Sequence, residues 1–192
     1  MIQAKPRFLS FEDYLAYDDG SEKWYELFNG ELIEVPPESG ENVQIANRLF
    51  LQFSLLLGTD RVRGQGLELE VWGEPKNRYP DLTILRSEPI QQLQKRNTIR
   101  LEMSPPILVA EVVSPDELQR ERDYRAKRQQ YQVLGIPEYW IVDPALQRIT
   151  ILILQDSAYI EQGVFRVQQP LQSPQFPDLF ITPAKLLIEQ RT

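Results

Sequence analysis

A single carboxylate interrupts the most apolar segment of this chain. Residues 107–113 read Ile-Leu-Val-Ala-Glu-Val-Val, which is the pattern of a strand buried on both faces of a sheet. An unpaired carboxylate in such a strand costs several kcal/mol. We therefore expect Glu111 to meet a metal ion or a cation, or to have a shifted pKa and a catalytic task.

The composition limits the chemistry that this carboxylate can join. The chain has 192 residues, of which 42% are hydrophobic, and this suits one globular domain over residues 1–192. It contains no His and no Cys, which excludes Ser-His-Asp and Cys-His nucleophile systems and the usual zinc sites. Any metal must therefore be held by oxygen, as Mg²⁺, Mn²⁺ and Ca²⁺ are, and any general base must be Asp, Glu, Lys or Tyr.

The overall charge is acidic. The net charge of −7 and the pI near 4.8 argue against generous non-specific binding to nucleic acid. A local basic run at residues 120–128 is either a track for phosphates or a solvated helix face. The chain has no charged-then-apolar leader and no apolar run long enough for a bilayer, so we expect a cytoplasmic protein without a membrane partner.

The periodicities predict a mixed α/β fold, with one sheet flanked by helices. Ser10 is a predicted helix N-cap, Asn29-Gly30 predicts a hairpin turn, and Gly58 and Gly135 are predicted helix stops. Residues 87–105 lack clear periodicity and predict a loop or a helical excursion. Predicted helices cover residues 10–17, 42–57, 114–134 and 183–190, and predicted strands cover residues 67–72, 81–85, 107–113, 138–143, 149–154 and 164–168.

The hairpin register places a second acid on an apolar face. With a two-residue turn, Glu26 lies opposite Ile33 and shares one face with Trp24, Phe28 and Val35. Glu26 either points into a site or is an edge-strand residue facing solvent.

Two acids and one lysine suggest a metal site. Asp81 begins one predicted strand and Glu111 lies inside another, so their carboxylates can meet if the strands pair. Two carboxylates, a backbone carbonyl and waters suit Mg²⁺. Lys127 shares a helix face with Tyr124 and Tyr131 at spacings i, i+3 and i+7, and it can stabilise phosphate charge or polarise water. The alternatives are a turn-forming Asp81, a structural Glu111 ion pair and a surface Lys127.

The ordered set of motifs resembles the Uma2 (Uma-two) family of restriction-endonuclease-like proteins, within the PD-(D/E)XK nuclease superfamily. The matching text lies at residues 25–32 (YELFNGEL), 80–82 (PDL), 111–115 (EVVSP), 123–127 (DYRAK), and 131–144, which includes GIPEYWIVDP. The resemblance implies a restriction-endonuclease-like fold over most of the chain.

The resemblance also implies roles for individual residues. Asp81 and Glu111 match the metal-binding acids, Glu26 matches an upstream acid of the site, and Lys127 matches a lysine that has moved from the strand to the following helix. The Val112 backbone carbonyl is the expected third metal ligand, with Mg²⁺ as cofactor and Mn²⁺ as substitute. The chain departs from the pattern at two positions: Val113, where the superfamily has its strand lysine, and Asn42, where relatives often carry His.

Three functions compete. The leading hypothesis is a Mg²⁺-dependent endonuclease that hydrolyses phosphodiester bonds of nucleic acid, DNA in the first place, with a metal-activated water. A non-catalytic nucleic-acid-binding or protein-assembly module of the same fold is the alternative, favoured by the acidic pI and by Val113. A two-carboxylate glycosidase is disfavoured by Lys127.

We expect a homodimer, because two-fold symmetry suits an enzyme acting on two strands. The aromatic residues predicted to supply the contact are Tyr139, Trp140, Tyr159 and Phe165.

Overall fold

The computed structural model describes residues 7–17, 20–21, 23–88, 90–94, 96–114 and 117–188, with residues 117–123 described by their backbone alone. A six-stranded sheet forms its centre, in the order β11-β10-β9-β8-β6-β3. β8 and β9 run parallel, and the other neighbours in this sheet are antiparallel. The strands are β3 (Val62–Arg63), β6 (Leu82–Ile84), β8 (Leu108–Val112), β9 (Glu138–Asp143), β10 (Arg148–Gln155) and β11 (Ala158–Arg166).

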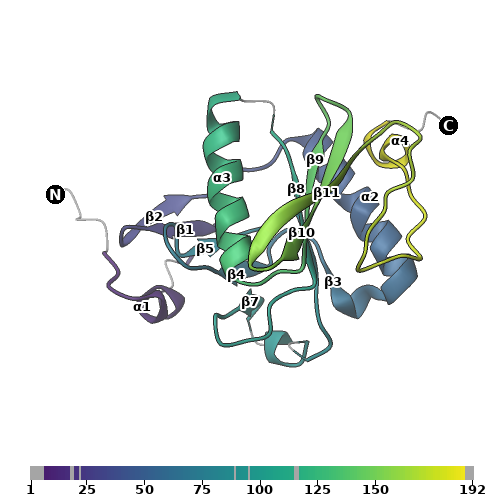
Figure 1. Ribbon diagram of the computed structural model, residues 1–192. Helices are drawn as coiled ribbons and strands as arrows, with labels where there is room; N and C mark the ends of the chain where they lie inside the picture. Colours follow the sequence, from purple (N-terminus) through teal and green to yellow (C-terminus); the bar gives the residue numbers. More distant parts are fainter. Residues whose placement is uncertain are drawn as a thin grey trace.

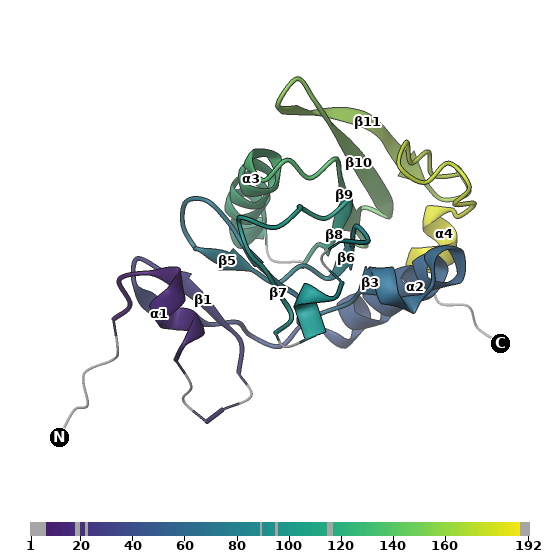
Figure 2. The same ribbon diagram turned by 90° about the horizontal axis from the view of Figure 1, so that it is seen from below.

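Helices cover both faces of this sheet (Figures 1 and 2). α3 (Glu117–Val133) lies on one face, and α2 (Gly40–Leu57) and α4 (Pro183–Leu187) lie on the other. Because β8 and β9 are parallel, the chain must cross over between them, and α3 is that crossover. It ends at Val133, and the φ of +77° at Gly135, just beyond it, allows the Ile136 N–H to donate to the Tyr131 carbonyl.

The alternation of side chains along β8 divides the core in two. Leu108, Ala110 and Val112 face the α2 side, where the larger apolar cluster includes Phe53 and Trp140. Val109 belongs to the second cluster, under α3, and Glu111 shares its face of the strand. The carboxylate singled out from the sequence therefore points toward α3.

Two smaller sheets extend the structure on the α3 side. The hairpin β1 (Tyr25–Phe28) and β2 (Glu31–Glu34) has the predicted register, with Glu26 opposite Ile33 and Phe28 opposite Glu31. α1 (Phe11–Leu15) lies beside it, capped by Ser10 as predicted. The third sheet has the order β5-β4-β7, from β4 (Glu68–Glu70), β5 (Asn77–Arg78) and β7 (Thr98–Ile99).

Several predicted boundaries move. β11 begins at Ala158 instead of residue 164, because it pairs along the length of β10. It ends at Arg166, two residues before the predicted end. The irregular stretch 87–105 contributes a 3₁₀ turn (Gln92–Gln94) and β7. Parts of two predicted helices lie outside the described residues: residues 115–116 of the helix over 114–134, and residues 189–190 of the helix over 183–190.

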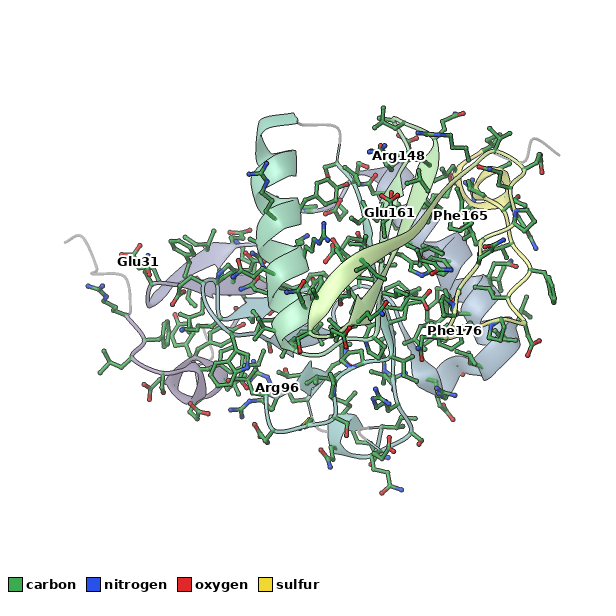
Figure 3. All side chains as sticks on the ribbon, viewed as in Figure 1. Glu31, Arg96, Arg148, Glu161, Phe165 and Phe176 are labelled. Carbon is green, nitrogen blue, oxygen red and sulfur yellow. The ribbon has the colours of Figure 1, made fainter. Side chains whose placement is uncertain are left out.

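The predicted aromatic dimer surface is wrong. Tyr139 and Trp140 are fully buried, and Tyr159 and Phe165 nearly so, because they fill the two cores of this chain. Tyr139 packs edge-on against Tyr131, and Trp140 against Phe53. Phe165 and Phe176, labelled in Figure 3, both belong to the larger apolar cluster.

The predicted fold class, a mixed α/β sheet flanked by helices, is confirmed. Among the described helices, none combines the length and the apolar character that a bilayer crossing requires.

Candidate active site

The pairing of β6 with β8 brings Asp81 and Glu111 together. Leu82 lies opposite Ala110 in this antiparallel ladder, so one step further Asp81 lies opposite Glu111. Opposite residues of an antiparallel pair project from the same face. The Val112 N–H donates to Asp81 Oδ2 at 2.7 Å, and both carboxylates are 5% exposed.

Helix α3 supplies donors to both oxygens of Glu111. Lys127 Nζ lies 2.9 Å from Oε2, and the Tyr131 hydroxyl donates to Oε1 at 2.5 Å. Burial raises the pKa of Tyr131 well above its usual value, and Glu111 raises it further, so this hydroxyl stays protonated and donates. Lys127 and Tyr131 lie one helical turn apart, and both reach the strand that precedes their helix.

Asp81 has a different environment. Its oxygens accept from neutral groups, the Val112 N–H and the Gln65 side-chain amide at 3.2 Å. Burial raises the pKa of Asp81 to about 7, and the neighbouring Glu111 carboxylate adds to the rise. Two carboxylates on one buried surface are favourable together only when a proton or a cation is shared between them.

Glu26 lies in the same cleft but binds a buried cation. Its carboxylate accepts from Arg78 Nη1 at 3.1 Å, and the Arg78 side chain is only 5% exposed. Arg78 Nε donates to Gln130 Oε1 at 2.8 Å, and the Gln130 amide donates to the Pro75 carbonyl. Glu26 is thereby connected to α3 through Arg78 and Gln130. From the sequence alone, Glu26 could also have been an edge-strand residue facing solvent.

The cleft encloses a volume of about 820 Å³, and all four predicted site residues line it. Val112 and Val113 line it as well, and Val113 presents an apolar side chain where the superfamily has a lysine. Among the described residues, no group of three or more His, Cys, Asp or Glu side chains forms a ready-made metal cage. A metal here would rely on two carboxylates, backbone oxygen and water.

Sequence reasoning missed three polar neighbours of these acids. Glu38 lines the cleft, accepts from Asn42 Nδ2 at 3.0 Å, and helps to raise the pKa of Asp81. Gln65 stands between two glycines, and Arg78 belongs to a two-residue strand. No periodicity marks these residues, since each comes from a turn, a loop or a two-residue strand. Asn42, buried on α2, also donates to Ser114 Oγ at 3.3 Å.

Comparisons with known proteins show the fold and the family of this chain. The chain is similar in structure to a protein described as "a putative nuclease belonging to DUF820" from Anabaena variabilis ATCC 29413, with a TM-score of 0.68 and 16% identity over 93% of this chain and 97% of that one. The fold is therefore restriction-endonuclease-like. The model of the Uma2 family, described as "Putative restriction endonuclease", matches residues 11–184. The chain belongs to the Uma2 family. No protein of curated function matches it.

Proposed function

We propose that this chain is a Mg²⁺-dependent endonuclease that hydrolyses phosphodiester bonds of DNA. The observation that carries the proposal is the pair of buried carboxylates on neighbouring strands, Asp81 and Glu111, with the Lys127 ammonium beside one of them. The family description, "Putative restriction endonuclease", agrees with this class of reaction.

The residues present fit a divalent cation. The pKa of Asp81 is raised to about 7 by burial and by Glu111, so a cation bound beside Asp81 would stabilise its carboxylate. Mg²⁺, or Mn²⁺ in its place, prefers such oxygen ligands, and the Val112 carbonyl is the proposed third protein ligand. When bound, the ion supplies a nucleophile from water at neutral pH and neutralises charge on the phosphate.

The chain's own residues perform the remaining tasks. Asp81 and Glu111 would hold the divalent cation. The hydrogen bond from the Val112 N–H keeps the Asp81 carboxylate in its rotamer. Lys127 orients the attacking water and stabilises charge as it develops on the phosphate, the task that Val113 cannot perform. The hydrogen bond from the Tyr131 hydroxyl keeps the Glu111 carboxylate oriented. Glu26 adds a carboxylate to the same cleft, and its ion pair with Arg78 holds it in place.

One observation favours the alternative, a non-catalytic module of the same fold. Lys127 and Tyr131 already occupy both oxygens of Glu111, so this carboxylate is satisfied without a metal. A structural ion pair of this kind needs no substrate. Cleavage of nucleic acid in the presence of metal decides between the endonuclease and the non-catalytic module.

The decisive experiment measures cleavage of a DNA panel with Mg²⁺ or Mn²⁺. Lys127→Ala should retain metal binding and lose cleavage by a factor of about 10² to 10⁴. Asp81→Asn and Glu111→Gln should lose both. Lys185→Ala is the matched control, because Lys185 is an exposed lysine of α4 and lies outside the cleft lining. Equal rates for wild type and Lys127→Ala would reject the role of Lys127, and a wild type that cuts nothing with either metal would favour the non-catalytic module.

We further propose that residues 1–192 form one domain, that the protein acts in the cytoplasm, and that it is a homodimer. The central six-stranded sheet, with helices on both faces, supports a single domain, and the preference of oligomers for two-fold symmetry supports the homodimer.

A further inference from the structure

An apolar wall faces the carboxylates of the cleft. Phe28 and Ile33 of the β1–β2 hairpin are 44% and 51% exposed, and with Val35 and Pro36 they line the same cleft as Asp81 and Glu111. Large apolar side chains grouped at the surface of a cleft mark a binding site more often than chance exposure. This wall has no part in holding a metal or in activating water.

The charges of the cleft are unsuited to a duplex backbone. Six carboxylates line it, against two cations, Arg78 and Lys127. Each of these cations is already in an ion pair, with Glu26 and Glu111 respectively. Proteins that track duplex DNA gain most of their affinity from Lys and Arg on successive phosphates. The described lining offers little of that, so affinity must come from the bases.

The wall is held in place relative to the acids. The Leu27 N–H donates to Asn77 Oδ1 at 2.8 Å, Glu26 binds Arg78, and Trp24 stacks on Tyr79 with ring centroids 5.5 Å apart. Residues 77–79 lead directly to Asp81. The apolar wall and the proposed metal ligands therefore form one rigid arrangement, ready for a planar group beside a phosphate.

We propose that the cleft binds an unpaired nucleotide of single-stranded DNA, with its base against Phe28 and Ile33 and its phosphate at Asp81 and Glu111. This rests on the proposed nuclease function and specifies its substrate class. Only unpaired nucleotides expose the faces of their bases, and a base stacked on protein side chains contributes about 1–3 kcal/mol. The volume of about 820 Å³ suits one ligand-sized unit.

The test measures the affinity of the protein for fluorescein-labelled oligonucleotides. The buffer contains Ca²⁺ in place of Mg²⁺, because Ca²⁺ also prefers oxygen ligands. The full chain should bind a single-stranded DNA at least tenfold more tightly than the duplex of the same sequence. Phe28→Ala should weaken binding of the single strand by about tenfold, within the range for one stacked base. Phe180→Ala is the matched control, because Phe180 is 83% exposed and lies outside the cleft lining, and it should bind as wild type does.

Two further probes separate this inference from the proposed function. A single strand without bases should bind as weakly as the duplex. The affinity for single-stranded RNA of the same sequence, compared with that for DNA, measures the contribution of the sugar. Equal affinity for duplex and single strand, or unchanged binding by Phe28→Ala, would overturn the inference even if the protein cuts duplex DNA. Phe28-dependent binding of single strands, by a protein that cleaves none of them with Mg²⁺ or Mn²⁺, would uphold the binding site and reject the nuclease.

Discussion

Glu111 shows how much one residue type at one position can indicate. A carboxylate within an apolar strand is unfavourable unless something compensates for its burial, and here Lys127 and Tyr131 do so. Asp81, one strand away, has only neutral donors among its described hydrogen bonds. The two acids of the site are therefore unequal: one is satisfied by α3, and the other is left for a proton or a metal.

This inequality predicts the pH dependence of metal binding. The pKa of Asp81 is raised from 3.8 to about 7, so the folded protein without metal holds a proton there at pH 6 and loses it by pH 8. Metal must displace that proton, and Mn²⁺ affinity measured by calorimetry should therefore be about tenfold weaker at pH 6 than at pH 8. Asp81→Asn should bind weakly at both values. Equal wild-type affinities at the two values would show that Asp81 is not the titrating ligand.

The same shift has a definite sign for stability without metal. A raised folded-state pKa means that the native state binds more protons than the unfolded chain between pH 3.8 and about 7. The contribution of Asp81 to the free energy of unfolding therefore falls as pH rises through this window. Asp81→Asn should remove this part of the pH dependence in urea unfolding.

At the scale of elements, the site depends on where strands and helices meet. The β6–β8 ladder sets Asp81 against Glu111, and the crossover through α3 returns Lys127 to the strand that it follows. The β1–β2 hairpin adds Glu26 and the apolar wall. Its turn is the most sharply specified feature, since Asn29 and Gly30 both have positive φ, at 50° and 79°.

Gly30 should therefore be intolerant of substitution. A Cβ there would lie 2.7 Å from the Phe8 carbonyl oxygen, in a conformation that side chains rarely adopt. Gly30→Ala should lower the free energy of unfolding by about 1–3 kcal/mol. Gly40→Ala is the internal control, because Gly40 begins α2 with open space around its Cα, and it should stabilise the protein by about 0.4–1 kcal/mol. Urea denaturation compares the two, and equal effects would contradict the proposed strain.

At the scale of the whole molecule, ion pairs connect elements that are far apart in the chain. Arg78, Lys127, Arg96 and Arg100 all bind carboxylates, and Figure 3 shows Arg96 next to α1, where it also reaches the Leu15 carbonyl. The Arg100 pairs join α1 to β4, the Arg78 pair joins β5 to β1, and the Lys127 pair joins α3 to β8.

Oligomeric state is a property of the whole molecule. We expect light scattering at micromolar concentration to give twice the chain mass of 22.5 kDa. The contact must use a surface other than the buried aromatics, and Leu51 and Leu55 of α2, 54% and 76% exposed and one turn apart, offer one. Leu55→Glu should then weaken the dimer. A monomeric wild type would contradict the homodimer and leave the chemistry of the cleft untouched.

The sequence by itself determined the local features. The apolar run around Glu111, the Asn29-Gly30 turn and the spacing of Lys127 and Tyr131 depend on neighbours within one strand, turn or helix, and all three lie in the structure as their patterns predict. Tertiary structure decided what meets across elements. Glu38, Gln65 and Arg78 join the site, and Tyr139 and Trp140 turn inward, because strand order and layer packing bring together residues far apart in the chain, which no local periodicity encodes.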